Sequence, residues 1–155
     1  MSPTSADDLA SGIIAVRLGR AEFGVPVLRV QEVVPTPRIS KLPFAESSVF
    51  GIASLRGTII PVLDLGDRLL GHAAARPGRL VIVEDRASRN LVGLLVDGVS
   101  GILAGPQEID TPPPEAEAVL PAGWMIGVVA LESDRLVTVL ELDAVLNLST
   151  AEEVA

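Results

Sequence analysis

Among the side chains of the types that carry acid–base chemistry in enzymes, three are candidates: Asp64, Asp97 and the single histidine, His72. Two carboxylates can act as general acid and general base, and a Ser-His-Asp triad would have to use His72. Each residue also fits an ordinary structural role. Asp64 stands before a helical stretch, Asp97 precedes Gly98 in an Asp-Gly turn, and His72 follows Gly71 in a polar loop. We therefore expect no catalytic residue, and a small ligand-binding β-barrel or a hydrolase is the alternative from a different functional class.

Arg56 indicates a different chemistry, because it interrupts an otherwise apolar region at Ser54-Leu55-Arg56-Gly57-Thr58. Gly57 fits a turn that needs a positive φ angle. A guanidinium group is well suited to hydrogen bonds at an interface, so Arg56 is predicted to contact a partner. The alternatives are a solvated turn residue or a local pair with an acid such as Asp64. Structural roles in turns are expected for Gly51, Gly57, Asp64, Gly93, Asp97 and Gly98.

Composition excludes several classes of function. The 155 residues carry a net charge of −8, with eleven arginines, one lysine and four aromatic residues, which disfavours nucleic-acid binding. Without cysteine there is no disulfide, thiolate nucleophile or thiolate zinc site, and we expect neither metal nor cofactor. No apolar run approaches the ~20 residues of a membrane span, and Asp7 and Asp8 argue against a signal peptide, so the expected location is the cytoplasm.

The elements that must position these residues are predicted to be short strands. Apolar runs of four to eight residues, rich in Val and Ile, are bounded by Gly, Pro, Asp or Ser. We predict strands at 12–18, 23–29, 38–42, 48–54, 58–63, 79–84, 91–96, 99–104, 124–131 and 135–140. Polar hairpin turns are predicted at 19–22, 85–90 and 132–134, and short helices at 65–70 and 142–148. The predicted class is all-β.

An internal repeat runs through these strands. Residues 23–30 align with 92–99, Gly51 and the residues after it align with Gly127, and residues 60–65 align with 137–142. Each half has about five strands and a helical turn, so two small packed barrels are expected, because closure of a sheet removes its edges. We place a flexible tail at 1–11, one domain at 12–148 with subdomains of roughly 12–75 and 76–148, and a second tail at 149–155. Whether strands are exchanged between the subdomains is left open.

In its motifs and their order, the sequence resembles the CheW-like domain of bacterial chemotaxis coupling proteins over about residues 12–147. The matching residues are Val30-Gln31-Glu32-Val33, Gly51, Leu55-Arg56-Gly57, Ile60-Pro61-Val62-Leu63-Asp64-Leu65, Val92-Gly93-Leu94-Leu95-Val96-Asp97-Gly98-Val99, Ile109 and Ile126-Gly127. The resemblance implies two SH3-like barrels of five strands on a hydrophobic core between them. It also implies an adaptor without enzymatic activity that holds a CheA-type histidine kinase against the cytoplasmic tip of chemoreceptors.

Carried over residue by residue, the resemblance assigns receptor contacts to Val30, Glu32, Val33, Arg56, Val99 and Ile102, as strips along a groove between the subdomains. It assigns kinase contacts to apolar strand ends, for which Leu63, Leu65 and Leu69 are the candidates. The family usually has Asn where this chain has Ser54, so we expect the side-chain hydrogen bonds of the turn to differ. The family often has Arg where this chain has Val34, which argues against a receptor salt bridge at that position. The expected partners are the kinase and a methyl-accepting receptor, with location at receptor arrays and a monomer in isolation. An adaptor of a non-flagellar pathway is the alternative within this class.

Overall fold

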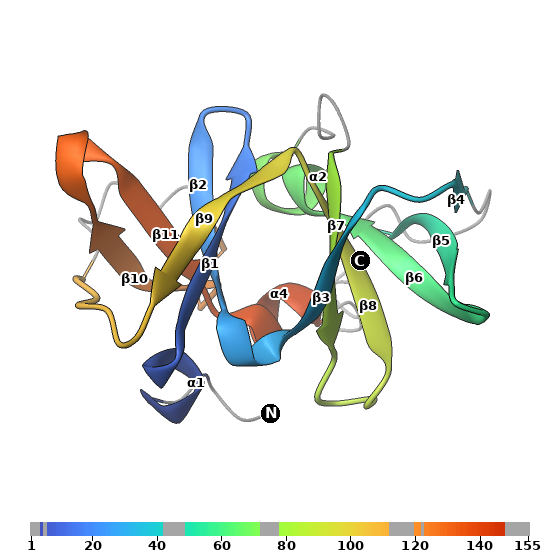
Figure 1. Ribbon diagram of the computed structural model, residues 1–155, viewed down its shortest axis with the longest axis horizontal. Coiled ribbons are helices and arrows are strands. Elements are labelled where there is room, and N and C mark those ends of the chain that lie inside the picture. The colour runs from blue at the N-terminus through green and yellow to red at the C-terminus, as the bar shows by residue number, and fades with distance from the viewer. Residues whose placement is uncertain are drawn as a thin grey trace. The chain divides into compact units, whose positions relative to one another are not determined.

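The computed structural model describes residues 4, 6–41, 49–71, 78–111, 120, 121 and 123–147 (Figure 1). The strands in these residues are β1 (Gly12–Leu18), β2 (Ala21–Pro26), β3 (Val30–Pro35), β4 (Ile39–Ser40), β5 (Val49–Leu55), β6 (Thr58–Asp64), β7 (Arg79–Glu84), β8 (Leu91–Val96), β9 (Gly98–Ala104), β10 (Met125–Ala130) and β11 (Leu136–Leu140). The α-helices are α1 (Ala6–Ala10), α2 (Leu65–Leu70) and α4 (Leu142–Leu146), and 3₁₀ turns cover η1 (Val27–Arg29) and η2 (Glu132–Asp134). The chain divides into unit 1 (residues 1–16, 21–28 and 100–155) and unit 2 (residues 17–20 and 29–99).

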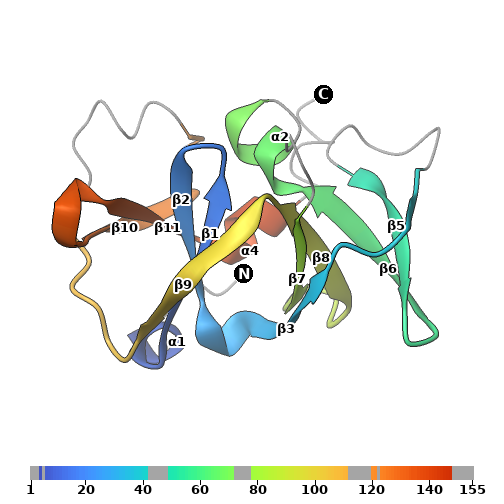
Figure 2. The same ribbon diagram turned by 45° about the horizontal axis from the view of Figure 1, so that its top comes forward.

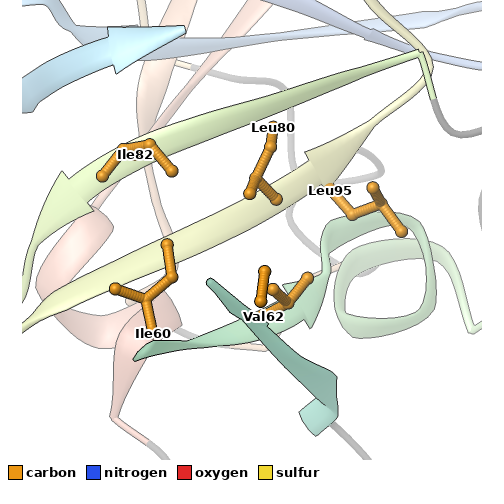
Figure 3. Packing of buried hydrophobic residues seen from close by; sticks show 6 residues of the cluster. Ile60, Val62, Leu80, Ile82 and Leu95 are labelled. Atoms are coloured by element: carbon orange, nitrogen blue, oxygen red, sulfur yellow. The ribbon is translucent and has the colours of Figure 1, made fainter. Parts of the chain in front are cut away.

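Unit 2 is built on a six-stranded sheet with the order β3-β7-β8-β6-β5-β4. Its paired strands are antiparallel except β6 and β8, which run parallel. Side chains alternate between the faces of a strand, so Ile60 and Val62 of β6 lie on one face, as do Leu80 and Ile82 of β7. Figure 3 shows these side chains gathered with Leu95 of β8 in the buried cluster of this unit. The alternation of the apolar residues therefore builds the core of unit 2.

Unit 1 is built on a five-stranded sheet with the order β10-β11-β2-β1-β9. Figure 2 shows β1 and β2 (blue) beside β9 (yellow). Here β10 and β11 are antiparallel, whereas β11 and β2 are parallel. Ile13, Ala15, Val129, Val137 and Val139 form the buried cluster, and Leu9 of α1 packs against it. Unit 1 therefore has a core of its own.

The two sheets follow the same strand path, which confirms the internal repeat. The order β5-β6-β8-β7-β3 of unit 2 corresponds strand for strand to β10-β11-β2-β1-β9 of unit 1. The registers agree as well, because Val62 pairs with Gly93 in one parallel contact and Val139 pairs with Gly24 in the other. The comparison of registers thus gives the residue equivalences between the units.

Two glycines at equivalent positions permit a close approach of strands. A Cβ on Gly51 of β5 would collide with the carbonyl oxygen of Ser40, and a Cβ on Gly127 of β10 would collide with the carbonyl oxygen of Asp110. Gly51, Gly93 and Gly98 belong to strands β5, β8 and β9, so the sequence-based assignment of turns to these three glycines was wrong. At Gly51 the reason for glycine is the space between strands.

The predicted subdomain boundary between residues 75 and 76 needs correction. Strands β1 and β2 belong to the sheet of unit 1, although they come from the first half of the sequence, and β7 and β8 belong to unit 2, although they come from the second half. Each unit therefore takes a pair of strands from the other half of the repeat. The physical reason is that both parallel pairs, β6 with β8 and β11 with β2, join strands that are distant in sequence.

The tails and the strand boundaries also differ from the predictions. Residues 6–10 form α1, whose Asp8 is buried, rather than a flexible tail. The second predicted strand, 23–29, ends at Pro26, and η1 separates it from β3 at 30–35. The three predicted hairpin turns and the helices that begin at Leu65 and Leu142 are confirmed. The predicted tail at 149–155 lies outside the described residues.

Candidate functional site

The turn between β5 and β6 consists of Arg56 and Gly57. Leu55 pairs with Thr58, and both turn residues have positive φ angles, 49° for Arg56 and 83° for Gly57. Two positive φ angles in a two-residue loop are typical of a type I′ hairpin turn, for which Asn-Gly and Gly-Gly are the favoured sequences. The prediction of a positive φ at Gly57 is confirmed. Arg56, in contrast, holds the left-handed conformation against a cost of about 1 kcal/mol for a residue with a Cβ.

Arg56 forms an ion pair with Glu32 of β3, to which its Nη2 donates a hydrogen bond. The side chain of Arg56 is 70% exposed and that of Glu32 is 30% exposed. Within the described part of the chain, the Nε and Nη1 groups of Arg56 have no hydrogen-bond partner. The guanidinium is thus oriented by Glu32 and offers its remaining N–H donors to solvent or to a partner.

The local pair with Asp64 that the sequence suggested is absent. The Asp64 Oδ1 atom accepts a hydrogen bond of 3.1 Å from the Asp67 backbone N–H and thereby caps α2. This contact satisfies one of the N–H groups that a helix start leaves unpaired. Asp64 is therefore a structural residue, as the sequence predicted.

A half-open cavity of about 380 Å³ lies beside the Arg56–Glu32 pair, entirely within unit 2. Ile60 and Ile82 line it from the core cluster but are almost fully buried, so its apolar surface comes from the half-buried Leu55 and Leu91. The complete lining is Gln31, Glu32, Leu55, Arg56, Thr58, Ile60, Ile82 and Leu91. The site therefore combines a mainly polar lining with the half-buried Leu55 and Leu91 and one exposed cation.

The equivalent place in unit 1 holds a hydrogen-bonded network of the chain's own side chains. Arg135 donates to the Glu22 carboxylate from Nε at 3.0 Å and from Nη2 at 2.6 Å. The Ser100 hydroxyl donates to the same carboxylate at 2.7 Å. The hydrogen bond to Glu22 and its charge raise the pKa of Arg135 above its ordinary value. Unit 1 thus places charges at this position that satisfy one another.

The other candidates for receptor contact fall in both units. Val30 and Val33 lie on β3 of unit 2, half-buried and exposed respectively, and Val99 at the start of β9 is half-buried. Ile102, on the part of β9 that belongs to unit 1, is exposed. Val33 and Ile102 occupy equivalent positions of the repeat, so each unit presents one exposed apolar residue on its edge strand.

The kinase-contact candidates Leu63, Leu65 and Leu69 are buried, so their assignment to a surface was wrong. Leu63 lies at the end of β6, and Leu65 and Leu69 lie on the inner side of α2. In the sequence, apolar residues at a strand–helix junction are compatible with a place in the core or on the surface. Their burial could not be predicted from the local pattern.

The two aspartates of the hydrolase alternative, Asp64 and Asp97, both make structural hydrogen bonds. Asp97 Oδ2 accepts a hydrogen bond of 2.6 Å from the Gly19 backbone N–H, and the Asp97 N–H donates to the Arg17 carbonyl at 3.0 Å. Asp97 thus connects β8 to β9 and holds the β1–β2 turn. His72 lies outside the described residues. Among the residues that the structure describes, His, Asp and Glu form no cluster of three or more that could hold a metal ion.

Sequence reasoning missed most of the cavity lining. It singled out Arg56 and Glu32 but did not pair them, because they are far apart in the chain and on different strands. It did not identify Gln31, Thr58 or Leu91. The available signal was alternation along β6, which places Thr58 and Ile60 on one side of the strand, together with the repeat that aligns Thr58 with Arg135.

None of the helices in the described ranges is long and apolar enough to span a membrane. The family model for the CheW-like domain matches residues 12–150. The chain is 34% identical over 140 residues to a probable chemotaxis protein CheW of Rhizobium etli, covering 90% of each protein. It is 35% identical over 109 residues to protein PilI of Pseudomonas aeruginosa, covering 66% of this chain and 60% of that protein.

Among solved structures, the scaffolding protein TtCheW of Thermoanaerobacter tengcongensis matches with a TM-score of 0.75 and 27% identity, over 90% of this chain and 94% of that chain. This match and the two sheets confirm the predicted all-β fold of two SH3-like barrels. The resemblance read from the sequence is confirmed as well. The chain belongs to the CheW-like domain family.

Proposed function

We propose that this protein is a non-enzymatic adaptor that couples the cytoplasmic tips of chemoreceptors to a CheA-type histidine kinase. Membership of the CheW-like domain family supports the general role. The observation that carries the proposal is Arg56, an exposed arginine in a left-handed turn where Asn or Gly is favoured. Arg89 has a positive φ as well, but Arg56 is in addition oriented by Glu32 at the rim of the cavity, and this arrangement supports a role in binding.

The receptor contact is assigned to the Arg56–Glu32 site of unit 2. The unpartnered N–H groups of Arg56 match a carboxylate on a receptor helix, and Glu32 holds the guanidinium in place. Val30 and Val33 on the neighbouring strand β3 add apolar surface. Val99 and Ile102 on β9 are kept as further candidates for the same partner.

The kinase contact is moved from the buried leucines to Ile59 and Leu136. These side chains are 70% and 57% exposed and lie at equivalent positions at the starts of β6 and β11. The family resemblance assigns kinase binding to apolar strand ends, and these two residues meet that description on the surface. An apolar residue exposed at one end of a barrel is available for association with a partner.

The test is an Arg56→Glu variant, measured separately against a receptor cytoplasmic hairpin and a CheA regulatory domain. Loss of the ion pair and a new repulsion should cost about 2–5 kcal/mol of receptor binding. Kinase binding and the thermal melt should stay close to wild type. Arg89→Glu is the matched control, because Arg89 is also an exposed arginine with positive φ in a turn of unit 2. Equal receptor affinity of the two variants would contradict the assignment.

An adaptor role in a non-flagellar pathway is the second candidate, favoured by the similarity to protein PilI. The two candidates share the same chemistry and differ only in the partner paralogues. Deletion of the gene followed by separate assays of swimming and of surface motility distinguishes them.

A further inference from the structure

The electric charge of the chain is divided unequally between the two units. Unit 2 contains eleven of the twelve basic residues and seven of the twenty acids, which gives it a net charge of +4. Unit 1 contains the remaining basic residue, Arg135, and thirteen acids, which gives it a net charge of −12. The chain as a whole is acidic, but unit 2 by itself attracts anionic groups.

Three exposed arginines of unit 2, Arg17, Arg20 and Arg79, lie beside the segment where β8 ends and β9 begins. We call these three residues the basic corner. The β1–β2 turn, which follows Arg17 and contains Arg20, is fixed to this segment by two hydrogen bonds. The Asp97 carboxylate accepts from the Gly19 N–H at 2.6 Å, and the Asp97 N–H donates to the Arg17 carbonyl oxygen at 3.0 Å.

Arg79 is joined to the same segment through β7 and β8. It is the register partner of Val96, and the N–H of the preceding Gly78 donates to the Val96 carbonyl oxygen at 3.1 Å. A Cβ on Gly78 would collide with the Asp97 carbonyl oxygen, so the start of β7 lies directly against the segment. The β1–β2 turn and the start of β7 therefore meet at one short stretch of backbone.

Gly98 determines where the Arg17 guanidinium lies. A Cβ on Gly98 would be 2.7 Å from Nη2 and 3.2 Å from Nη1 of Arg17, so the guanidinium lies against the backbone of this glycine. Gly98 is not among the residues with a positive φ angle, and the atoms in conflict are the far end of a flexible side chain. An alanine at this position is therefore compatible with β9 but displaces the guanidinium.

No acid among the described residues neutralises these three guanidinium groups by contact. Arg79 Nη1 donates to the Gly78 carbonyl oxygen at 2.9 Å, and within the described ranges the side chains of Arg17 and Arg20 make no hydrogen bond or ion pair. Asp97 uses Oδ2 for the backbone of the β1–β2 turn, and its Oδ1 is buried. Exposed guanidinium groups in this state offer N–H donors to the carboxylates of another molecule.

The basic corner is separated from the Arg56–Glu32 site by the length of β8. Leu91, which begins β8, lines the cavity beside that site, whereas Val96 ends β8 at the corner. At about 3.3 Å per residue, the strand places roughly 17 Å between its two ends. A molecule bound at the corner therefore makes a contact distinct from the one assigned to Arg56.

We propose that the basic corner binds a short acidic segment of a protein partner. Guanidinium groups bind carboxylates through pairs of hydrogen bonds, so several arginines close together suit a segment with two or more acids. The net charge of −8 on the chain opposes a long polyanion such as a nucleic acid or an anionic membrane, whose charge extends beyond one barrel. A short segment meets the positive corner alone.

The probe for the test is a fluorescein-labelled peptide of alternating glutamate and alanine, with a control peptide that has glutamine in place of each glutamate. Binding is measured by fluorescence anisotropy at low and at physiological ionic strength, with a thermal melt of every variant. The double variant Arg17→Gln/Arg79→Gln removes two charges from the corner. Arg89→Gln is the matched control, because Arg89 is an exposed arginine in the turn at the other end of β8.

We expect the double variant to lower the affinity for the acidic peptide by about tenfold or more at low ionic strength, and Arg89→Gln to change it by less than about twofold. The control peptide should bind neither protein measurably. Equal losses in the double variant and in Arg89→Gln would show an effect of overall charge and overturn the proposal. Equal affinity of wild type for the two peptides overturns it as well.

A second variant tests the position of Arg17 without removing a charge. Gly98→Ala should lower the affinity about as much as Arg17→Gln, and the combination of the two should cause no further loss, because both act on one guanidinium. Gly101→Ala, where a Cβ meets nothing nearby, is the control. Additive losses, or wild-type affinity of Gly98→Ala with an unchanged melt, contradict the role of Gly98.

Inorganic pyrophosphate and phosphatidylglycerol vesicles are measured in parallel as anions of other classes. Both should bind more weakly than the acidic peptide. If either binds more tightly and its binding is lost in the double variant, the corner recognises that anion and the assignment to a protein segment is overturned.

Discussion

Unit 1 and unit 2 share one strand path. They differ at one turn, which joins β10 to β11 in unit 1 and β5 to β6 in unit 2. In unit 2 the turn has two residues, Arg56 and Gly57, whereas in unit 1 Glu132–Asp134 forms a turn that is one residue longer. The short turn presents Arg56 to Glu32 across the barrel mouth, and the longer one is followed by Arg135, which bonds to Glu22. The two copies of the fold thus differ in their arginines: Arg56 is exposed and makes one hydrogen bond to Glu32, whereas Arg135 makes two to Glu22.

The acids before α2 and α4 show the same divergence. Asp64 caps α2 through the Asp67 N–H. Its equivalent, Glu141, makes no capping bond with its side chain and instead accepts hydrogen bonds from the Thr4 backbone N–H and hydroxyl. Glu141 has one more methylene than Asp64, and it binds Thr4 instead of capping its helix.

The largest effect is expected from the buried leucines at equivalent positions, Leu65 in unit 2 and Leu142 in unit 1. Both are fully buried, so replacement by alanine should lower the free energy of unfolding by about 2–5 kcal/mol in either unit. Urea denaturation measures the change, and Ile59→Ala, an exposed site, is the control. A Leu65→Ala protein with wild-type stability and impaired kinase binding would restore the surface assignment rejected above.

The next effect concerns the glycines that allow close strand approach. Gly51→Ala and Gly127→Ala should each lower the free energy of unfolding by about 1–3 kcal/mol, because the new Cβ meets a backbone carbonyl oxygen, that of Ser40 or that of Asp110. Similar losses in the two variants indicate that the repeat preserves this packing. Gly101→Ala is the control, since a Cβ there meets nothing nearby. A neutral result at one of the two glycines would show that the units differ here as well.

A smaller effect separates the acids before the helices. Asp64→Ala should cost about 1 kcal/mol of global stability through loss of the cap. Glu141→Ala should instead speed amide hydrogen exchange at Thr4 and in α1 while leaving core strands protected. Exchange measured by mass spectrometry on both variants checks the contrast. Unchanged exchange at Thr4 in Glu141→Ala would rule out the attachment.

The smallest effect has the opposite sign. Arg56→Asn should raise the free energy of unfolding by about 0.5 kcal/mol, because Asn tolerates the left-handed conformation of a type I′ turn better than Arg does. The same substitution should weaken receptor binding. Thermal unfolding and a receptor-hairpin titration are measured on one preparation. A variant that gains neither stability nor a binding defect contradicts the view that Arg56 is retained for function.

Local features of the fold were predictable because they depend on neighbouring residues. Short apolar runs located β6, β7 and β8, and Gly57 indicated its turn, since strand and turn preferences act over a few residues. The segment from Val27 to Val33 was less predictable. The apolar residues of this segment continue those of β2 and do not reveal the 3₁₀ turn that separates β2 from β3.

The candidate site was predictable only in part. Arg56 was recognised because a charge between apolar strands is unusual, and Glu32 because of its place in the family motif. Their pairing, and the cavity beside them, arise from strands β3, β5, β6, β7 and β8 meeting at one barrel mouth. The spacing of residues along the chain does not predict these contacts, because they join strands that are distant in sequence.

The amino-acid sequence by itself determined the short strands, the duplication, the tight turn at Gly57 and membership of the CheW-like domain family. These properties follow from side-chain periodicity and backbone preferences within single segments. Only the tertiary structure decided that β7 and β8 complete unit 2 and that Leu65 is core, and it alone set Glu32 against Arg56. Strand pairing across the chain is chosen by the total burial it achieves, and burial is a property of the assembled barrels rather than of any one strand.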